Sequence, residues 1–172
     1  MSIVVWIVEG TWPACIDAAQ AQVQVRAEAT EATELTLLHV TDSAVAGIAH
    51  NAYTALLGRG HRAHGQDPGA LMEHLADTAA HDLLDAAAAR LQRPCTRVAR
   101  TGRPEREVVQ AADGADLLIL ARDGDRSRLG PRSLGHHTRF VVDHAPCPVL
   151  LVWPEPAPGL TTIPPPPHHG PH

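Results

Sequence analysis

The chain has 172 residues, of which 44% are hydrophobic, and its formal net charge is −5. This length suits one domain of ordinary size, and the hydrophobic content is too high for a disordered chain. All 14 basic residues are arginines, which excludes every mechanism that needs a lysine nucleophile, a Schiff base or a P-loop lysine. The acidic balance argues against a nucleic-acid partner, since such proteins usually carry a basic excess.

No apolar run approaches the roughly 18 residues that a membrane span requires, so no membrane partner is expected. The short apolar run Ile3–Val8 lacks a basic leader and a cleavage site, and we interpret it as a strand instead of a signal peptide. The expected compartment is therefore the cytoplasm. Cys15, Cys95 and Cys147 show no paired spacing, which is typical of reduced cytosolic thiols and not of a disulfide framework or a zinc site.

The first half of the chain begins with a predicted strand over Ile3–Val8, which ends in Glu9-Gly10-Thr11. Pro13 fits the first turn of a helix that we expect to reach about Ala29. A second strand is predicted over 34–40. Residues 42–66 are ambiguous: 44–57 favour a short helix, and the glycines of 58–66 favour a loop.

A long helix is predicted from Asp67-Pro68, with Asp67 as its N-cap. Its apolar residues recur at helical spacing and predict a buried stripe. The stripe comprises Leu71, Leu75, Ala79, Leu83, Ala87 and Leu91.

The second half of the chain predicts a strand over 96–101, a helix over 104–112 and a wholly apolar strand over 117–120. A last helix over 135–144 and a last strand over 148–153 follow. Strands that alternate with helices indicate a parallel sheet with right-handed crossovers. A sheet that is covered by helices on both faces requires apolar strands, and most of these strands are apolar. Arg97 and Arg100 instead indicate that the third strand is a solvated edge.

After Trp153 the composition changes, because residues 154–172 hold eight prolines and no helical or strand period. Such a segment buries too little apolar surface to offset its ordering entropy. We therefore predict one α/β domain over 1–153 and a flexible Pro/His-rich tail over 154–172.

Three segments together resemble the universal stress protein family. They are the first strand with Glu9-Gly10-Thr11, where the family has an Asp-Gly-Ser-like turn, the stretch from Thr101-Gly102-Arg103-Pro104-Glu105 to Leu120, and the closing His144-Ala145-Pro146-Cys147-Pro148-Val149-Leu150-Leu151-Val152. The resemblance covers 3–153 and implies a Rossmann-like, five-stranded parallel sheet in the order 3-2-1-4-5. Strands one and four then lie side by side where the strand order reverses, and ligands of open α/β sheets bind at the carboxyl ends of such strands.

The resemblance also implies a nucleotide site, since ATP-binding members carry the motif Gly-x2-Gly-x9-Gly-Ser/Thr. Glycines allow close approach of phosphates, and the N–H groups that open a helix favour an anion. Here the stretch runs from Ala121 to Gly124, then ten residues, then Gly135-His136. It departs from the motif at Ala121, in the length of the spacer and at His136.

The candidate residues for binding ATP or a related adenine nucleotide lie around this predicted cleft. They are Glu9, Gly10, Thr11, Val40, Ala121, Arg122, Gly124, Gly135, His136 and His137. Four arginines on the loop are candidates to pair with phosphate and compensate for the altered motif; they are Arg122, Arg126, Arg128 and Arg132. The alternative is a solvated loop in an arginine-rich protein, where Asp123 and Asp125 neutralise part of the charge.

Other chemistry finds less support. The sequence holds 12 histidines, but His74 and His81 lie two helical turns apart, which is too far to share an ion, and we predict no metal cofactor. Cys147 lies between two prolines and is interpreted as a small hydrophobic residue instead of a nucleophile. No catalytic residue is identified.

Two functions remain open at this point. The first is a stress-response regulatory protein that binds an adenine nucleotide without marked turnover. The second is a dimeric interaction module of the same family that binds no nucleotide. In either case the apolar last strand, expected at the sheet edge, predicts a homodimer through that strand, as the resemblance also implies, together with a protein partner that the sequence does not identify. The rival is that the segment after Pro154 covers this edge and leaves a monomer.

Overall fold

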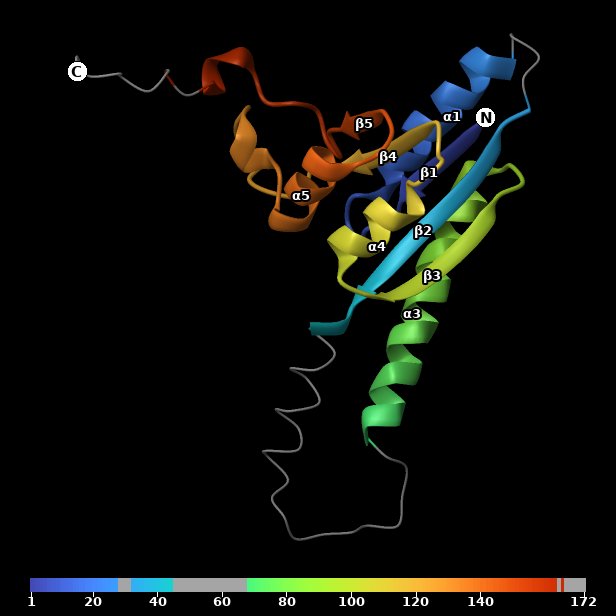
Figure 1. The fold of residues 1–172 in the computed structure, drawn as a ribbon. Coiled ribbons are helices and arrows are strands. Elements are labelled where there is room, and N and C mark those ends of the chain that lie inside the picture. Colours follow the sequence, from blue (N-terminus) through green and yellow to red (C-terminus); the bar gives the residue numbers. More distant parts are fainter. Residues whose placement is uncertain (28–31, 45–67, 164, 166–172) are drawn as a thin grey trace, which may run out of the picture.

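The computed structural model describes residues 1–27, 32–44, 68–163 and 165. Five parallel strands form one sheet in the order β3-β2-β1-β4-β5 (Figure 1). The strands are β1 (Ser2–Trp6), β2 (Glu34–Asp42), β3 (Thr96–Gly102), β4 (Leu117–Ala121) and β5 (Val149–Val152). The predicted fold class and strand order are confirmed.

Helices cover both faces of this sheet (Figure 1). They are α1 (Trp12–Ala27), α3 (Pro68–Leu91), α4 (Pro104–Ala111) and α5 (His136–His144). Helices α1 and α3 pack on one face and on each other, and α4 and α5 pack together on the other face. Apart from its first residue, the predicted helix over 44–57 lies outside the described residues, as do the predicted loop over 58–66 and the expected N-cap Asp67.

Two hydrophobic cores lie on the two faces of the central strands. In β1, Ile3 and Val5 belong to the core under α1 and α3, whereas Val4 and Trp6 belong to the core under α4 and α5. This alternation follows from the two-residue period of a strand. All five residues of β4 are buried, as expected for a strand that is covered on both faces.

The two edges of the sheet differ in charge. On β3, Arg97 pairs with Asp85 of α3, and Arg100 pairs with Glu107 of α4. The predicted solvated edge is therefore confirmed at β3. Strand β5 carries no charge, and its four residues are each partly exposed.

The predicted buried stripe of α3 is wrong in its first half, because Leu71 and Leu75 are about half exposed, at 47% and 53%. Two causes combine. Residues four apart turn by about 40° per step, since a helix has about 3.6 residues per turn, so a strict four-residue repeat leaves one face. The first turns of α3 also project beyond the ends of the strands (Figure 1). The buried residues follow spacings of four, three and four and so keep to one face: they are Ala80, Leu84, Ala87 and Leu91.

The segment after Trp153 runs to the loop that follows β4. Within residues that the sequence predicted to lack regular structure, one 3-10 turn forms at Leu160–Thr162. The hydroxyl of Thr162 donates to the carbonyl of Gly159 at 2.7 Å and accepts from the N–H of Leu129 at 3.1 Å. These local bonds explain a turn without a helical period. The division into a domain and a flexible tail stays a prediction.

Candidate functional site

The strand order reverses between β1 and β4. Strand β1 pairs with β2 on one side and with β4 on the other, where Val5 lies opposite Ile119. Both strands run in the same direction, so the chain leaves them at the same edge of the sheet, after Trp6 and after Ala121. This reversal is the switch point at which open α/β sheets bind ligands.

The turn after β1 is built on the carbonyl of Val8. That oxygen accepts from the N–H of Thr11 at 3.1 Å, the N–H of Trp12 at 3.0 Å and the hydroxyl of Thr11 at 3.3 Å. Gly10 has a φ of +77°, a conformation that favours glycine. Thr11 is buried and holds the turn, whereas Glu9 and Gly10 are exposed beyond the carboxyl end of β1.

The loop after β4 folds back on itself. The N–H of Gly124 donates to the carbonyl of Ser133 at 3.0 Å, and the N–H of Asp125 donates to the carbonyl of Arg132 at 2.8 Å. A Cβ on Gly124 would lie 2.4 Å from the carbonyl oxygen of Arg132. Glycine is therefore required here because two backbone segments approach closely.

Asp123 contacts the residue that precedes α5. Its Oδ1 accepts from the N–H of Gly135 at 2.7 Å, and Gly135 is the N-cap of α5. A Cβ on Gly135 would lie 2.8 Å from both carboxylate oxygens of Asp123. The carboxylate therefore lies at the N-terminus of the helix, where anions are favoured.

The loop arginines are engaged mainly with protein groups. Arg122 donates to the hydroxyl of Ser133, and its guanidinium carbon lies 4.7 Å from the centroid of the Trp153 ring. Two further arginines form ion pairs: Arg126 with Glu155 at 3.6 Å and Arg128 with Asp125 at 3.1 Å. The sequence predicted four loop arginines as candidates to bind phosphate, and three of them already contact other side chains.

The ring of His137 joins α5 to two other elements. Its Nδ1 lies 2.7 Å from Oε2 of Glu105 at the start of α4, and its Nε2 lies 4.0 Å from Oδ2 of Asp42 at the end of β2. Partial desolvation alone would raise the pKa of the Glu105 carboxyl. The backbone N–H of Glu105, the hydrogen bond to His137 and the charges of His137 and His136 outweigh it, so the pKa is lowered.

The predicted site residues therefore divide into two groups. The residues at the carboxyl edge are Glu9, Gly10, Thr11, Arg122, Gly124, Gly135, His136 and His137. Val40 and Ala121 are 7% exposed and belong to opposite hydrophobic cores, so their side chains contribute packing. His136 is exposed, and its ring lies edge-on to that of His137 at 5.4 Å between centroids.

Sequence reasoning missed three carboxylates near the first turn of α5. Asp42, Glu105 and Asp123 follow or end β2, β3 and β4 respectively. The available signal was positional, since carboxyl ends of parallel strands meet at one edge of the sheet. The sequence favours Asp123 as a partner for the loop arginines, because its bond to Gly135 spans 12 residues of sequence and leaves no local signal.

Burial weakens the case for a reactive thiol. Cys15 is fully buried, and desolvation raises its pKa to about 12. Desolvation also raises the pKa of the Cys147 thiol, assisted by the charge of Asp116 and partly offset by the backbone N–H of Leu118. These thiols are protonated at neutral pH, and a protonated thiol is a poor nucleophile.

Two features are absent from the part of the chain that the structure describes. No group of three or more His, Cys, Asp or Glu side chains there is arranged to hold a metal ion. Within the same part of the chain, no helix is both long and apolar enough to cross a membrane.

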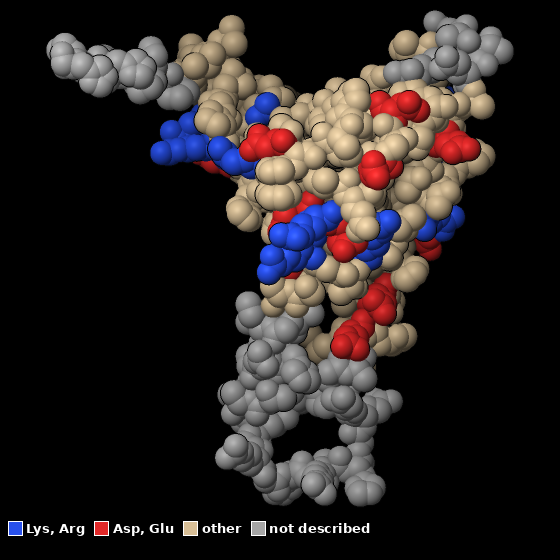
Figure 2. Space-filling model, in the orientation of Figure 1, with Lys and Arg blue, Asp and Glu red and all other residues tan. Residues whose placement is uncertain are grey.

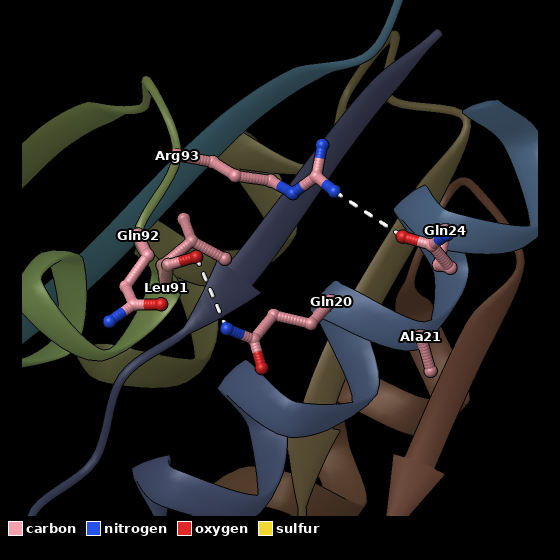
Figure 3. A pocket seen from close by; sticks show the side chains of 6 residues that line it. All are labelled: Gln20, Ala21, Gln24, Leu91, Gln92 and Arg93. Atoms are coloured by element: carbon pink, nitrogen blue, oxygen red, sulfur yellow. Dashed lines mark hydrogen bonds between the residues drawn. The ribbon is translucent and has the colours of Figure 1, made fainter.

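A hollow of about 600 Å³ lies away from the switch point, between α1 and the end of α3 (Figure 3). The amide of Gln20 fastens the two helices there by donating to the carbonyls of Arg90 and Leu91 at 2.9 and 3.2 Å. The carbonyl end of a helix carries negative partial charge and disfavours an anion. The remaining lining residues are Ala21, Gln24, Gln92 and Arg93.

Comparison with known proteins gives consistent results. The model of the universal stress protein family matches residues 16–152. A curated relative from Thermus aquaticus, the universal stress protein in the QAH/OAS sulfhydrylase 3'region, is 45% identical over 53 residues, which is 30% of this chain and 38% of that protein. The matched stretch therefore spans less than half of the relative.

Solved structures share the fold at low identity. The structure of hypothetical protein MJ0577 has a TM-score of 0.61 at 20% identity and covers 88% of this chain and 94% of that one. A universal stress protein in complex with cAMP has a TM-score of 0.56 at 17% identity, with 90% and 98% covered. The family match extends from α1 to the end of β5. The chain belongs to the universal stress protein family.

Proposed function

We propose that this chain is a stress-response regulatory protein that binds ATP or a related adenine nucleotide at the carboxyl edge of β1 and β4, without marked turnover. One observation carries the proposal. The first turn of α5 is tied to the residues at the ends of β2, β3 and β4 through Asp42, Glu105 and Asp123. Its N–H groups therefore lie at the edge of the sheet where the strand order reverses.

The exposed turn after β1 supports the same location. Glu9 and Gly10 are exposed beside the switch point, and Gly10, whose positive φ favours glycine, adds no side chain there. A fold neighbour of this chain is a universal stress protein in complex with cAMP, which supports an adenine nucleotide as the ligand class here.

The test is a thermal unfolding series with ATP, AMP, cyclic AMP and adenosine. A ligand at 100 times its dissociation constant stabilises the folded state by about 2.7 kcal/mol. For a domain of this size we expect the melting temperature to rise by several degrees. If no adenine compound stabilises the chain at millimolar concentration, the proposal fails and the alternative, a dimeric interaction module without a nucleotide, replaces it.

Gly135→Val locates the binding within the chain. A Cβ there meets the Asp123 carboxylate at 2.8 Å, and a branched side chain would fill the space in front of the first N–H of α5. We expect stabilisation by phosphate-bearing ligands to disappear in this variant. Ala89→Val is the control, because Ala89 is exposed on α3. Unchanged nucleotide stabilisation in Gly135→Val would contradict this location.

The same proposal includes a homodimer through β5. This strand pairs with β4 along Val149–Val152 and carries no charge, yet each residue is partly exposed. An apolar edge favours pairing with a second copy. Glu155 and Thr162 contact the loop after β4, which supports an uncovered β5 edge.

Sedimentation of the full chain at tens of micromolar tests this assembly, and we expect a dimer. The comparison is the chain truncated after Glu155. A full chain that is monomeric, and that dimerises or aggregates only when truncated, would mean that the removed segment covers β5 and would overturn the dimer.

A further inference from the structure

The first turn of α5 is surrounded by negative side chains. Asp123 accepts from the N–H of Gly135 at 2.7 Å. On the side of α4 and β2, Glu105 and Asp42 flank the ring of His137 at 2.7 and 4.0 Å. Glu105 and Asp42 are thus partnered with a histidine, whereas Asp123 contacts the backbone N–H that an incoming anion would use.

Asp123 and a phosphate oxygen are chemically alike in this position. An ionised carboxylate is an acceptor without a donor, as a phosphate oxygen is, and both are favoured by free N–H groups and by the dipole at a helix N-terminus. The contact is tight, because a Cβ on Gly135 would lie 2.8 Å from both carboxylate oxygens. A phosphate that reaches Gly135 must therefore displace the carboxylate or approach it closely.

Three of the four loop arginines are already engaged by other groups of the protein. Arg122 is engaged by Ser133 and Trp153, Arg126 by Glu155 and Arg128 by Asp125. The face drawn in Figure 2 likewise shows arginine and acidic side chains next to one another instead of one extended positive area. Repulsion between Asp123 and a bound phosphate chain rises with the number of charges on that chain.

We propose that Asp123 is a specificity-determining residue, an internal anion that occupies the phosphate position and makes the cleft select adenine ligands with little phosphate charge. Adenosine and AMP are then preferred to ATP. This proposal rests on the proposed function and narrows it to a ligand class.

The first test is isothermal titration of adenosine, AMP and ATP into the full chain and into Asp123→Asn and Asp123→Ala. We expect both variants to bind ATP about tenfold tighter than the parent chain, or about 1.4 kcal/mol. AMP should gain less, and adenosine should stay within about twofold, since it has no charge to repel. Asp113→Asn is the matched control: it removes one charge from an exposed residue in the turn before β4, at the opposite edge of the sheet, and should resemble the parent chain.

The second test needs no nucleotide. The NMR amide resonance of Gly135 should have the same chemical shift in the parent chain and in Asp113→Asn. It should change in Asp123→Ala, which removes the carboxylate that accepts from this N–H. A Gly135 resonance that is unchanged in Asp123→Ala would show that Asp123 does not occupy this N–H, and would overturn the proposal.

The outcomes separate the two proposals. If adenosine and ATP bind the parent chain equally well and Asp123→Asn changes neither, the selectivity is wrong while nucleotide binding stands. If no adenine ligand binds the parent chain or either Asp123 variant, both proposals are overturned. Tighter ATP binding in the Asp123 variants with unchanged adenosine affinity supports both.

Discussion

Gly124 and Gly135 both belong to the altered glycine motif, but they should respond very differently to alanine. A Cβ on Gly124 would lie 2.4 Å from the Arg132 carbonyl oxygen and 2.9 Å from the carbonyl carbons of Ser133 and Leu134. All three are backbone atoms, so the two arms of the loop must separate.

The magnitude follows from the bonds that close the loop. Gly124→Ala should break the 3.0 Å bond from Gly124 N–H to Ser133 and the 2.8 Å bond from Asp125 N–H to Arg132. Each hydrogen bond contributes about 0.5–1.5 kcal/mol net, and the alanine recovers about 0.4–1 kcal/mol by restricting the unfolded chain. We expect the free energy of unfolding to fall by about 1–2 kcal/mol.

Gly135→Ala should cost much less. Gly135 has φ −66° and ψ 175°, which alanine adopts without strain. The three atoms nearest to its added Cβ all belong to the Asp123 carboxylate, and that exposed side chain is free to rotate away. Alanine restricts the unfolded chain more than glycine does, and this gain largely offsets the lost hydrogen bond. The free energy of unfolding should therefore change by no more than about 0.5 kcal/mol.

Urea denaturation followed by circular dichroism measures both variants, with an unchanged m-value as the sign that the same transition is compared. A Gly124→Ala protein as stable as the parent chain would refute the requirement for close backbone approach. A Gly135→Ala protein that is less stable than Gly124→Ala would refute the conclusion that Gly124, and not Gly135, lies against a second backbone segment.

Three further outcomes follow from burial and pKa. Leu84 is 1% exposed and Leu75 is 53% exposed on the same helix, so Leu84→Ala should cost about 2–5 kcal/mol and Leu75→Ala under about 0.5 kcal/mol in urea denaturation; equal costs would contradict the placement of α3. Cys15, whose pKa is raised to about 12, should react with a thiol reagent at about pH 8 only after unfolding, and rapid labelling of the folded chain at that position would refute its burial. Desolvation would raise the pKa of Glu105, but its own backbone N–H and then its contacts with His137 outweigh this and lower it. The stability that Glu105→Gln removes should therefore be full above the unfolded pKa of about 4.3 and vanish as the pH falls through the lower folded value; a loss that does not diminish in acid would contradict these contacts.

Much of the fold was predictable because its signals are local. The apolar runs at 3–8 and 117–120 and the arginines of β3 report directly on which strands are covered and which is an edge. The strand order came from the family resemblance and is confirmed. The predicted stripe of α3 is wrong at Leu71 and Leu75, which are about half exposed. Periodicity alone does not say where a helix extends beyond the sheet.

The candidate site was predictable in its position and less so in its chemistry. The switch point and the glycine loop follow from chain order and motif. The partner of each charged side chain depends on contacts between residues far apart in sequence, as in Asp123 with Gly135, Arg126 with Glu155, and His137 with Glu105. Charge in sequence suggested an arginine-lined phosphate site, but the folded loop presents an aspartate to the helix.

The central claim is that an adenine nucleotide binds where β1 and β4 end. The most direct measurement is an amide NMR titration of the full chain with AMP at millimolar concentration. We expect the largest resonance changes in Gly10 and Thr11 after β1, in Arg122–Gly124 after β4 and in Gly135–His137 at the start of α5. Saturable changes confined to other parts of the chain, such as Gln20–Gln24 and Leu91–Arg93 around the hollow between α1 and α3, would contradict the claim.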